Sequence, residues 1–221
     1  MFLRKVITFS GLDGAGKTTV IDALKEKFES ERKIVKIFTM YDDLSLYAIL
    51  RLFRNSIRKF FGRELKLPKE AEGIPNFDPH PNSLFYKIIR SRFLKTMVLP
   101  LDTLAVYLFL LVKTKRSDIV LLDRTSYDYI LDVLPERYSK MRISIALLFS
   151  VRPTLSVFVD TPAQVSFDRK GEFTVEYLAW RSTTYAQIFD ILNNKIVIDN
   201  YNNSIENNVN VLFNQFKSIE K

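Results

Sequence analysis

One stretch of eight residues constrains the fold of this chain more than any other feature. Residues Gly11–Thr18 read GLDGAGKT and lie between an apolar, strand-like run at Lys5–Ser10 and a segment with helical spacing at Val20–Phe28. Glycines let the backbone of such a loop curl until successive N–H groups point inward, and the N-terminus of the following helix adds positive potential. Spacing and context together predict a phosphate-binding loop between a strand and a helix.

Two side chains of this loop suit a bound nucleotide. Lys17 is placed to reach the β- and γ-phosphates of ATP, and the Thr18 hydroxyl is placed to ligate Mg²⁺. ATP and Mg²⁺ are therefore the expected cofactors. The residues expected to surround the phosphates are Gly11, Leu12, Asp13, Gly14, Ala15, Gly16, Lys17, Thr18 and Thr19.

A second motif lies at the end of a later apolar run. Residues Ile119–Asp123 consist of four apolar residues followed by a carboxylate. An acid at the carboxyl end of a parallel strand can hold the magnesium shell, so Asp123 is the second predicted metal ligand. Arg124 follows directly, and a guanidinium at this place suits a bidentate grip on phosphate oxygens.

Short apolar runs alternate with segments of helical spacing along the 221 residues. This alternation predicts a doubly wound α/β fold with a parallel sheet, and the length suits one compact domain. The predicted strands are Lys5–Ser10, Ile34–Thr39, Asp118–Asp123, Leu155–Asp160 and Lys195–Asp199.

Helix starts and packing faces can also be predicted. One helix is expected to start at Thr161, which precedes a proline, and another at Asn203, which stands three residues before Glu206 as in a capping box. Trp180 is expected to be a packing residue. The aromatic residues whose helical spacing predicts a core position are Tyr177, Tyr185 and Phe189.

Composition excludes several kinds of chemistry. The absence of cysteine excludes disulfides, Cys-ligated metals and thiol nucleophiles, and the single histidine, His80, has no second histidine with which to form a metal site or a triad. The first residues lack a signal-peptide pattern, so a cytoplasmic location is expected. The most apolar stretch, Leu104–Val112, is too short to span a membrane and is predicted to be a buried helix.

The formal net charge of +8 is concentrated in one segment. Residues 51–95 contain eleven Lys or Arg and four acidic residues, which accounts for +7 of that charge. Prolines within residues 66–83 predict a loop, and the whole of residues 44–97 is expected to form a helical insertion on the substrate side. Such a basic block suits nucleic acid, an anionic lipid or an anionic substrate, although a solvated charged face is the favoured interpretation.

Taken together, the motifs resemble the thymidylate kinase family of nucleoside monophosphate kinases. The resemblance spans most of the chain and implies a three-layer P-loop NTPase fold with a five-stranded parallel sheet, ATP and Mg²⁺ as phosphoryl donor, a mobile lid at about residues 168–174, and a homodimer. The matching segments are residues 11–19, Asp123-Arg124, Val159–Pro162, and Arg169–Glu172 ahead of a helix that contains Tyr185.

The same resemblance implies roles for single residues. Asp13 would lie near the sugar hydroxyl of the phosphate acceptor, and Arg124 would bind the acceptor's phosphate. Some family members carry an arginine where this chain has Gly14, whereas others supply that charge from the lid, as Arg169 and Lys170 would here. The catalytic residues implied are Lys17, Asp123, Arg124 and Arg169.

The positions that would read the acceptor base depart from the family pattern. The family places a phenylalanine and an arginine well before the Asp-Arg pair, at a position that falls near Asp102 in this chain. The nearest substitutes are Phe85 with Arg90 and Phe93 with Lys95, and the first pair, Phe85 and Arg90, becomes the predicted base-binding residues. Thr125 also stands where the family has an aromatic residue. Recognition of thymine is therefore the weakest part of the resemblance.

Three functions remain open from the sequence. The leading one is phosphoryl transfer from ATP to a nucleoside monophosphate, with dTMP as the first acceptor to test. The second is a P-loop kinase that phosphorylates a nucleoside or a sugar-like alcohol, with Asp13 or Asp123 as base. The third and least favoured is a nucleotide-dependent protein that binds nucleic acid or a membrane through residues 51–95.

Overall fold

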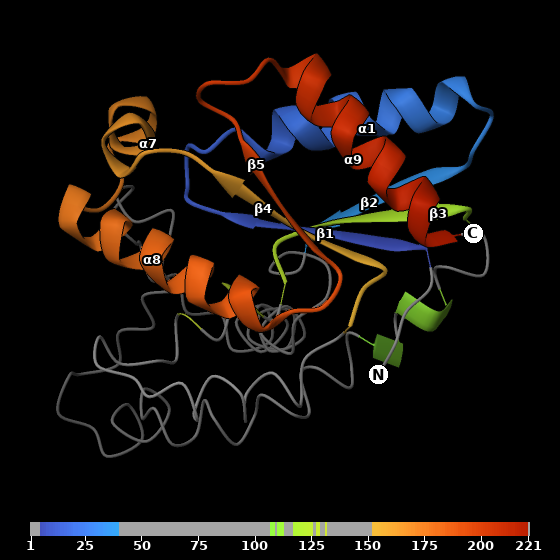
Figure 1. Ribbon diagram of the computed structural model, residues 1–221, viewed down its shortest axis with the longest axis horizontal. Helices are drawn as coiled ribbons and strands as arrows, with labels where there is room; N and C mark the ends of the chain where they lie inside the picture. Colours follow the sequence, from blue (N-terminus) through green and yellow to red (C-terminus); the bar gives the residue numbers. More distant parts are fainter. Residues whose placement is uncertain are drawn as a thin grey trace, which may run out of the picture.

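The computed structural model describes residues 5–39, 107–108, 110–112, 117–125, 127–128, 131 and 152–220. Within these residues the chain forms an α/β fold, in which helices flank both faces of an all-parallel sheet (Figure 1). The predicted fold class is confirmed at this level.

Five strands make up the sheet in the described part of the chain. Each lies within one residue of its predicted bounds, and the three central strands are buried along almost their whole length, which is why they read as mainly apolar runs in the sequence. The strands are β1 (Val6–Gly11), β2 (Val35–Thr39), β3 (Ile119–Asp123), β4 (Leu155–Asp160) and β5 (Lys195–Asp199). They lie in the order β2-β3-β1-β4-β5, and every neighbouring pair is parallel.

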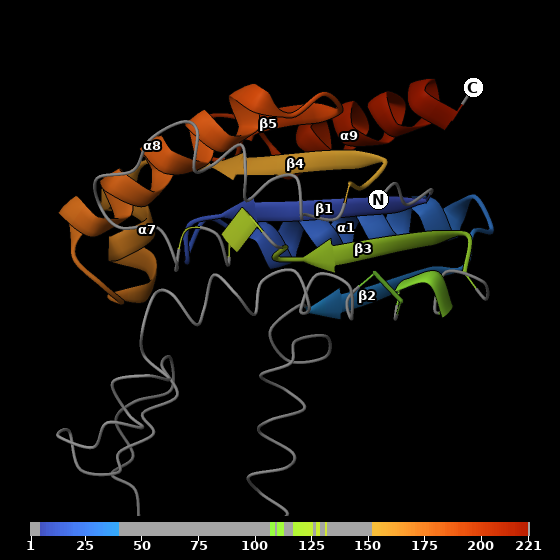
Figure 2. The same cartoon turned by 90° about the horizontal axis from the view of Figure 1, so that it is seen from below.

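The helices complete a three-layer arrangement. Their bounds are α1 (Lys17–Ser30), α7 (Ala163–Lys170), α8 (Val175–Ile191) and α9 (Ile205–Glu220). Helices α1 and α9 pack together on one face of the sheet, and α8 covers the other face (Figure 1). Helix α7 lies beyond the carboxyl ends of the strands and contacts α8 (Figure 2).

Aromatic side chains join the helices to each other and to the sheet. On the α1 side, the ring of Phe28 lies 5.5 Å from that of Phe216 on α9, in an edge-to-face arrangement. On the α8 side, the ring of Phe158 on β4 lies 5.5 Å from Tyr185 and 5.4 Å from Phe189. Tyr185 and Phe189 are fully buried, so their predicted core positions are confirmed.

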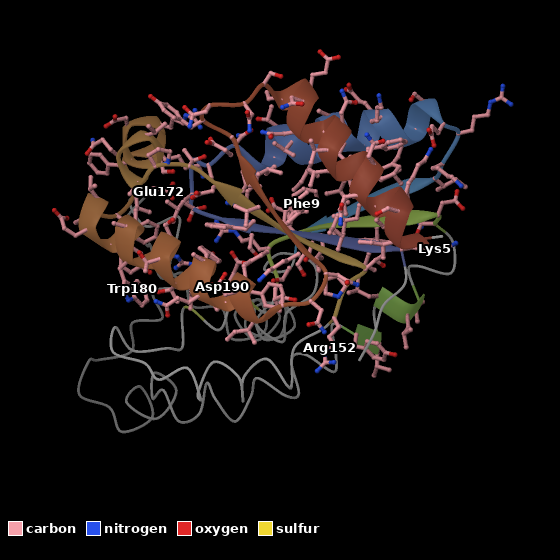
Figure 3. All side chains as sticks on the ribbon, in the orientation of Figure 1. Lys5, Phe9, Arg152, Glu172, Trp180 and Asp190 are labelled. Carbon is pink, nitrogen blue, oxygen red and sulfur yellow. The ribbon has the colours of Figure 1, made fainter. Side chains whose placement is uncertain are left out.

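The first half of α8 carries aromatic residues that are not in the core. Tyr177 is only half-buried, which makes its predicted core position wrong. Its ring lies 5.6 Å from that of Trp180, so Trp180 is a packing residue as expected. Figure 3 shows Trp180 on α8, on the side of the sheet opposite α1 and α9, with Phe9 in the sheet between the layers.

Both predicted helix starts need correction. Helix α7 begins two residues after Thr161, with Pro162 at the N-cap and no side-chain cap, because the Thr161 hydroxyl bonds to backbone carbonyls instead. At the start of α9, the Oγ of Ser204 accepts a bond of 3.2 Å from the backbone N of Asn207. Ser204 is therefore the capping residue that the sequence interpretation assigned to Asn203.

The apolar stretch at Leu104–Val112 is described only at residues 107–108 and 110–112, and these are helical. Leu110 is buried, but Leu108 and Val112 are exposed, so the predicted buried helix is wrong for this part. Among the described residues, no helix combines the length and apolarity that a membrane crossing requires. The expected insertion at residues 44–97, with its basic block and the candidate residues Phe85 and Arg90, lies outside the described residues.

Candidate functional site

The strand ends that carry the predicted site residues meet at one edge of the sheet. Phe9 of β1 is in register with Asp123 of β3, and Gly11 of β1 is in register with Val159 of β4. Since all the strands are parallel, their carboxyl ends point in the same direction, toward α7 (Figure 2). Ligands of open parallel sheets bind at such an edge, near the strand where the order reverses.

The loop Gly11–Thr18, called the glycine loop from here on, connects β1 to α1. Gly14 and Gly16 have φ values of 88° and 84°, which L-residues with a Cβ rarely adopt. The surroundings restrict Gly14 more than Gly16, because the neighbour of Gly14 is helix backbone and that of Gly16 is the end of a side chain. A Cβ on Gly14 would lie 2.6 Å from the backbone oxygen of Ser166 in α7, and one on Gly16 would lie 2.4 Å from Nδ2 of Asn200. The loop therefore needs glycine at both positions for conformation and for space.

The N-terminus of α1 is free of any side-chain cap. Gly16 occupies the N-cap position and provides no side-chain cap. The first N–H groups of a helix have no partner inside the helix, so these donors and the positive end of the helix dipole are directed at the site. Thr18 and Thr19 in this turn are exposed. Together these features suit an anion at the end of α1.

Lys17 lies across the glycine loop and is largely buried. Its Nζ donates to the backbone oxygens of Gly11 and Leu12, at 3.0 and 2.7 Å. Burial lowers the pKa of the Lys17 ammonium below its ordinary value, and the nearby Arg124 guanidinium lowers it further. Because both acceptors belong to the loop itself, the side chain can leave them for another acceptor without breaking contacts elsewhere in the fold.

Asp123 provides a carboxylate next to this lysine. Burial raises the pKa of Asp123, and the positive charges of Lys17 and Arg124 oppose that effect. One carboxylate oxygen, Oδ1, is buried and has no hydrogen-bond partner. An orphaned, buried carboxylate oxygen of this kind is a fitting ligand for a hard cation.

The residues present fit Mg²⁺, although no group of three or more His, Cys, Asp or Glu residues gathers as a metal site in the described part of the chain. Magnesium in nucleotide sites is usually held by one or two protein oxygens and keeps its remaining positions for phosphates and water. The carboxylate of Asp123 and the hydroxyl of Thr18 supply that smaller set.

Arg124 turns sharply at the end of β3. Its φ is 65°, an uncommon value for a residue other than glycine, and its backbone N donates to the oxygen of Phe9 at 2.9 Å. The guanidinium forms an ion pair and a hydrogen bond with the carboxylate of Asp13 in the glycine loop. The two residues that the family resemblance assigns to the phosphate acceptor thus lie in direct contact.

Arg169 contacts the glycine loop although it lies 155 residues away from Gly14 in the sequence. It lies near the end of α7, where Gly171 in the left-handed region terminates the helix. Its Nη1 donates to the backbone oxygen of Gly14 at 3.1 Å. The expected lid segment, residues 168–174, therefore contacts the loop through this arginine.

Two supports of the glycine loop were not predicted. Asn200, directly after β5, donates from Nδ2 to the backbone oxygen of Ala15 at 2.8 Å, and Thr161, after β4, bonds to the same oxygen at 3.3 Å. Asn208 on α9 donates to Asp199 O at 3.0 Å and so holds the β5 end in place. A polar residue directly after a predicted strand was the only available signal, and it is too common to single these residues out.

A buried carboxylate, Asp128, was also missed. It accepts hydrogen bonds from Ser10, Thr125 and Tyr185, on three separate segments around the site. The sequence did contain a signal, since Thr125 followed three residues later by an acid is a capping-box pattern.

Most of the predicted site residues are thus assembled at one place. The structure brings Asp13, Lys17, Asp123, Arg124 and Arg169 to the glycine loop, whereas the predicted base-binding residues fall outside the described part. Comparison with known proteins adds no assignment, because no protein-family model and no curated protein matches this chain.

Proposed function

We propose that this chain is an ATP-dependent P-loop kinase similar to the thymidylate kinases, which transfers the γ-phosphate of ATP to a small acceptor, with dTMP as the first candidate. One observation carries the proposal. The glycine loop, with Lys17 and the uncapped start of α1, stands beside the carboxylate of Asp123 and the guanidinium of Arg124 at the end of the adjacent strand.

The glycine loop supplies the groups that bind the donor. The N–H groups at the start of α1 and the ammonium of Lys17 are suited to the β- and γ-phosphates, and the Lys17 ammonium would exchange its two loop carbonyls for phosphate oxygens. Asp123 and Thr18 would hold Mg²⁺, which neutralises charge on the phosphates when bound. The work of these residues is positioning and charge compensation rather than covalent chemistry.

Arg124 is the group suited to the acceptor. In this structure its guanidinium is held by Asp13, so the phosphate of an acceptor would compete with that carboxylate or share the guanidinium with it. A phosphate acceptor already carries an ionised nucleophilic oxygen and needs no general base. An alcohol acceptor would need one, and the pairing of Asp13 with Arg124 makes Asp13 less suited to that role.

Residues 168–174 are proposed to act as the lid. Arg169 already contacts the backbone of Gly14, so only a small movement of its side chain would bring a positive charge to phosphates in the loop. This would replace the arginine that some thymidylate kinases carry inside the loop itself. Closing the segment would also exclude water from the transferring group. Dimerisation and cytoplasmic location, both expected from the sequence, stay predictions.

The test is an ATP-consumption screen with Mg²⁺ across dTMP, the other nucleoside monophosphates, nucleosides and a set of sugars. Lys17→Ala serves as the blank, because its side chain bonds only to loop carbonyls among the contacts described and its loss leaves the core unchanged. Circular dichroism and urea unfolding check that the variant is folded.

Three outcomes of the screen have different meanings. Turnover with dTMP alone supports the thymidylate kinase assignment. Turnover with an alcohol and none with any monophosphate keeps the P-loop kinase and replaces the acceptor. Absence of turnover with every acceptor, or full activity in Lys17→Ala, overturns the proposal.

A further inference from the structure

Asp128 is completely buried and takes no part in the proposed phosphoryl transfer. Its Oδ2 accepts hydrogen bonds from Ser10 Oγ at 2.9 Å and from the backbone N of Thr125 at 3.0 Å, and its Oδ1 accepts one from the hydroxyl of Tyr185 at 2.6 Å. These donors belong to β1, to the turn that follows β3, and to α8. A single carboxylate therefore joins three segments that are far apart in the sequence.

On one side, Asp128 fixes the turn that presents Arg124. The Thr125 hydroxyl accepts from the backbone N of Tyr127 at 3.0 Å while Asp128 accepts from the backbone N of Thr125, which is the reciprocal pattern of a capping box. The preceding residue, Arg124, has a φ of 65°. Such a conformation persists when the surrounding contacts determine it, and these contacts include the backbone bond to Phe9 and the capping box that follows at Thr125.

On the other side, the hydrogen bonds continue along α8. The Tyr185 hydroxyl accepts from Arg181 Nη2 at 3.3 Å, and Arg181 Nη1 donates to the Tyr177 hydroxyl at 3.0 Å. Tyr177 lies in the first turn of α8, and its ring is 5.1 Å from that of Phe173. Phe173 belongs to residues 168–174, so a continuous set of contacts runs from that segment to the turn at Arg124.

We propose that Asp128 is a positioning residue that fixes the turn at Arg124 relative to α8. The Arg124 guanidinium is thereby also held in a fixed position relative to the 168–174 segment. The inference rests on the proposed function for its consequence, which is binding of an anionic acceptor by Arg124. A chain of contacts alone does not establish coupling, so the test must separate positioning of Arg124 from general support of the core.

Two substitutions alter the hydrogen bond at the centre of the link. In Asp128→Asn, the amide oxygen can keep the bonds from Ser10 and Thr125, but the amide nitrogen can only donate to the Tyr185 hydroxyl, so the short bond to an ionised acceptor is replaced by a weaker neutral one. Tyr185→Phe removes the same bond from the α8 side. Both variants therefore leave the capping box intact; Tyr185→Phe removes the bond between the turn and α8, and Asp128→Asn weakens it.

Tyr127→Phe is the matched control. Tyr127 is also a fully buried tyrosine on the segment after Arg124, and its hydroxyl lies 3.3 Å from the Oγ of Ser156 on β4. The control removes one buried hydroxyl, as Tyr185→Phe does, without touching the link to α8. If these hydroxyls only supported the core, neither variant would change the acceptor KM without also changing the ATP KM.

The kinetic readout compares two values, the KM for the acceptor that the functional screen identifies and the KM for ATP. We expect the acceptor KM to rise about tenfold in Tyr185→Phe and by a smaller factor in Asp128→Asn, because a small misplacement of a binding group is costly. The ATP KM should change by less than about twofold, since no donor-binding residue is altered. In an Arg124→Ala background, Asp128→Asn should add less than about twofold, because the group it positions is already gone.

Hydrogen exchange of the free protein tests the same link without any activity. The backbone N–H of Arg124 is bonded to Phe9, and peptides covering residues 121–128 should exchange faster in Asp128→Asn and Tyr185→Phe than in wild type or Tyr127→Phe. Unchanged exchange, or an acceptor effect shared with Tyr127→Phe, overturns the inference. If wild type turns over no acceptor, the proposed function fails, and the exchange result still decides whether Asp128 holds the turn.

Discussion

Gly14→Ala and Gly171→Ala form a pair in which the structure predicts very different costs for the same chemical change. Both glycines have left-handed backbone conformations, with φ values of 88° and 65°. A Cβ on Gly171 would meet nothing within 4 Å, whereas a Cβ on Gly14 would lie 2.6 Å from the backbone oxygen of Ser166. That oxygen belongs to α7, so relief of the clash requires movement of a helix or of the glycine loop.

The expected losses of stability follow from two features, the left-handed backbone conformation and the contact that the added Cβ would make. A residue with a Cβ in the left-handed region costs about 1–2 kcal/mol, and this is the whole expected loss of stability for Gly171→Ala. Forcing a methyl group into occupied space typically costs a further 1–3 kcal/mol, so Gly14→Ala should lose about 2–5 kcal/mol. The lower entropy of the unfolded alanine chain is the same for both variants and cancels in the comparison.

Urea unfolding, followed by the fluorescence of the single tryptophan, Trp180, and by circular dichroism, measures both variants against wild type. The free energy of unfolding is expected to be highest in wild type, lower in Gly171→Ala and lowest in Gly14→Ala. Equal losses in the two variants, or a smaller loss in Gly14→Ala, would refute the contact between the glycine loop and α7.

Three further substitutions test other parts of the structure. Asn200→Ala, which removes the 2.8 Å bond to Ala15 O, should cost about 1 kcal/mol and weaken the stabilisation of the protein by MgATP in thermal melting; a full MgATP effect would contradict its support of the loop. Phe28→Ala should cost about 3–5 kcal/mol in urea unfolding, because this buried ring joins α1 to α9. Lys217→Ala should cost less than about 1 kcal/mol, although its bond to Glu31 is 2.6 Å long, because both side chains are exposed to solvent; a larger loss that Glu31→Ala shares would show that this pair, and not the contact of Lys217 with the Phe213 ring, fixes α9.

The sheet could be predicted from the sequence almost to the residue. Each strand is a short apolar run, and Ile119–Asp123 shows why the signal is clear, since its first four residues are buried on a sheet covered by helices on both faces. The carboxyl end of that strand could be predicted with equal clarity, because Asp123 breaks the apolar run. A local pattern sufficed here because burial on both faces leaves no polar positions to confuse it.

Helix starts were predicted less well because side chains that can cap a helix have other uses. Asn203 and Ser204 are both acceptable capping residues, and local sequence alone does not decide between them. Thr161 is occupied by a distant contact, since its hydroxyl bonds to Ala15 O. Asn200 and Arg169 support or contact the glycine loop in the same long-range way, and a single sequence contains no signal for such pairings.

The electrostatics of the site explain why the predicted motif residues belong together. Burial lowers the pKa of Lys17 and raises that of Asp123, so both groups are held in surroundings that disfavour their charged forms. Phosphate oxygens beside Lys17 would favour its ammonium form, and a cation beside Asp123 would favour its carboxylate form. A ligand that carries both kinds of charge, as a magnesium nucleotide does, therefore opposes both shifts at once. Burial of groups in surroundings that disfavour their charged forms is common at functional sites, which supports the phosphate-binding role proposed for this edge of the sheet.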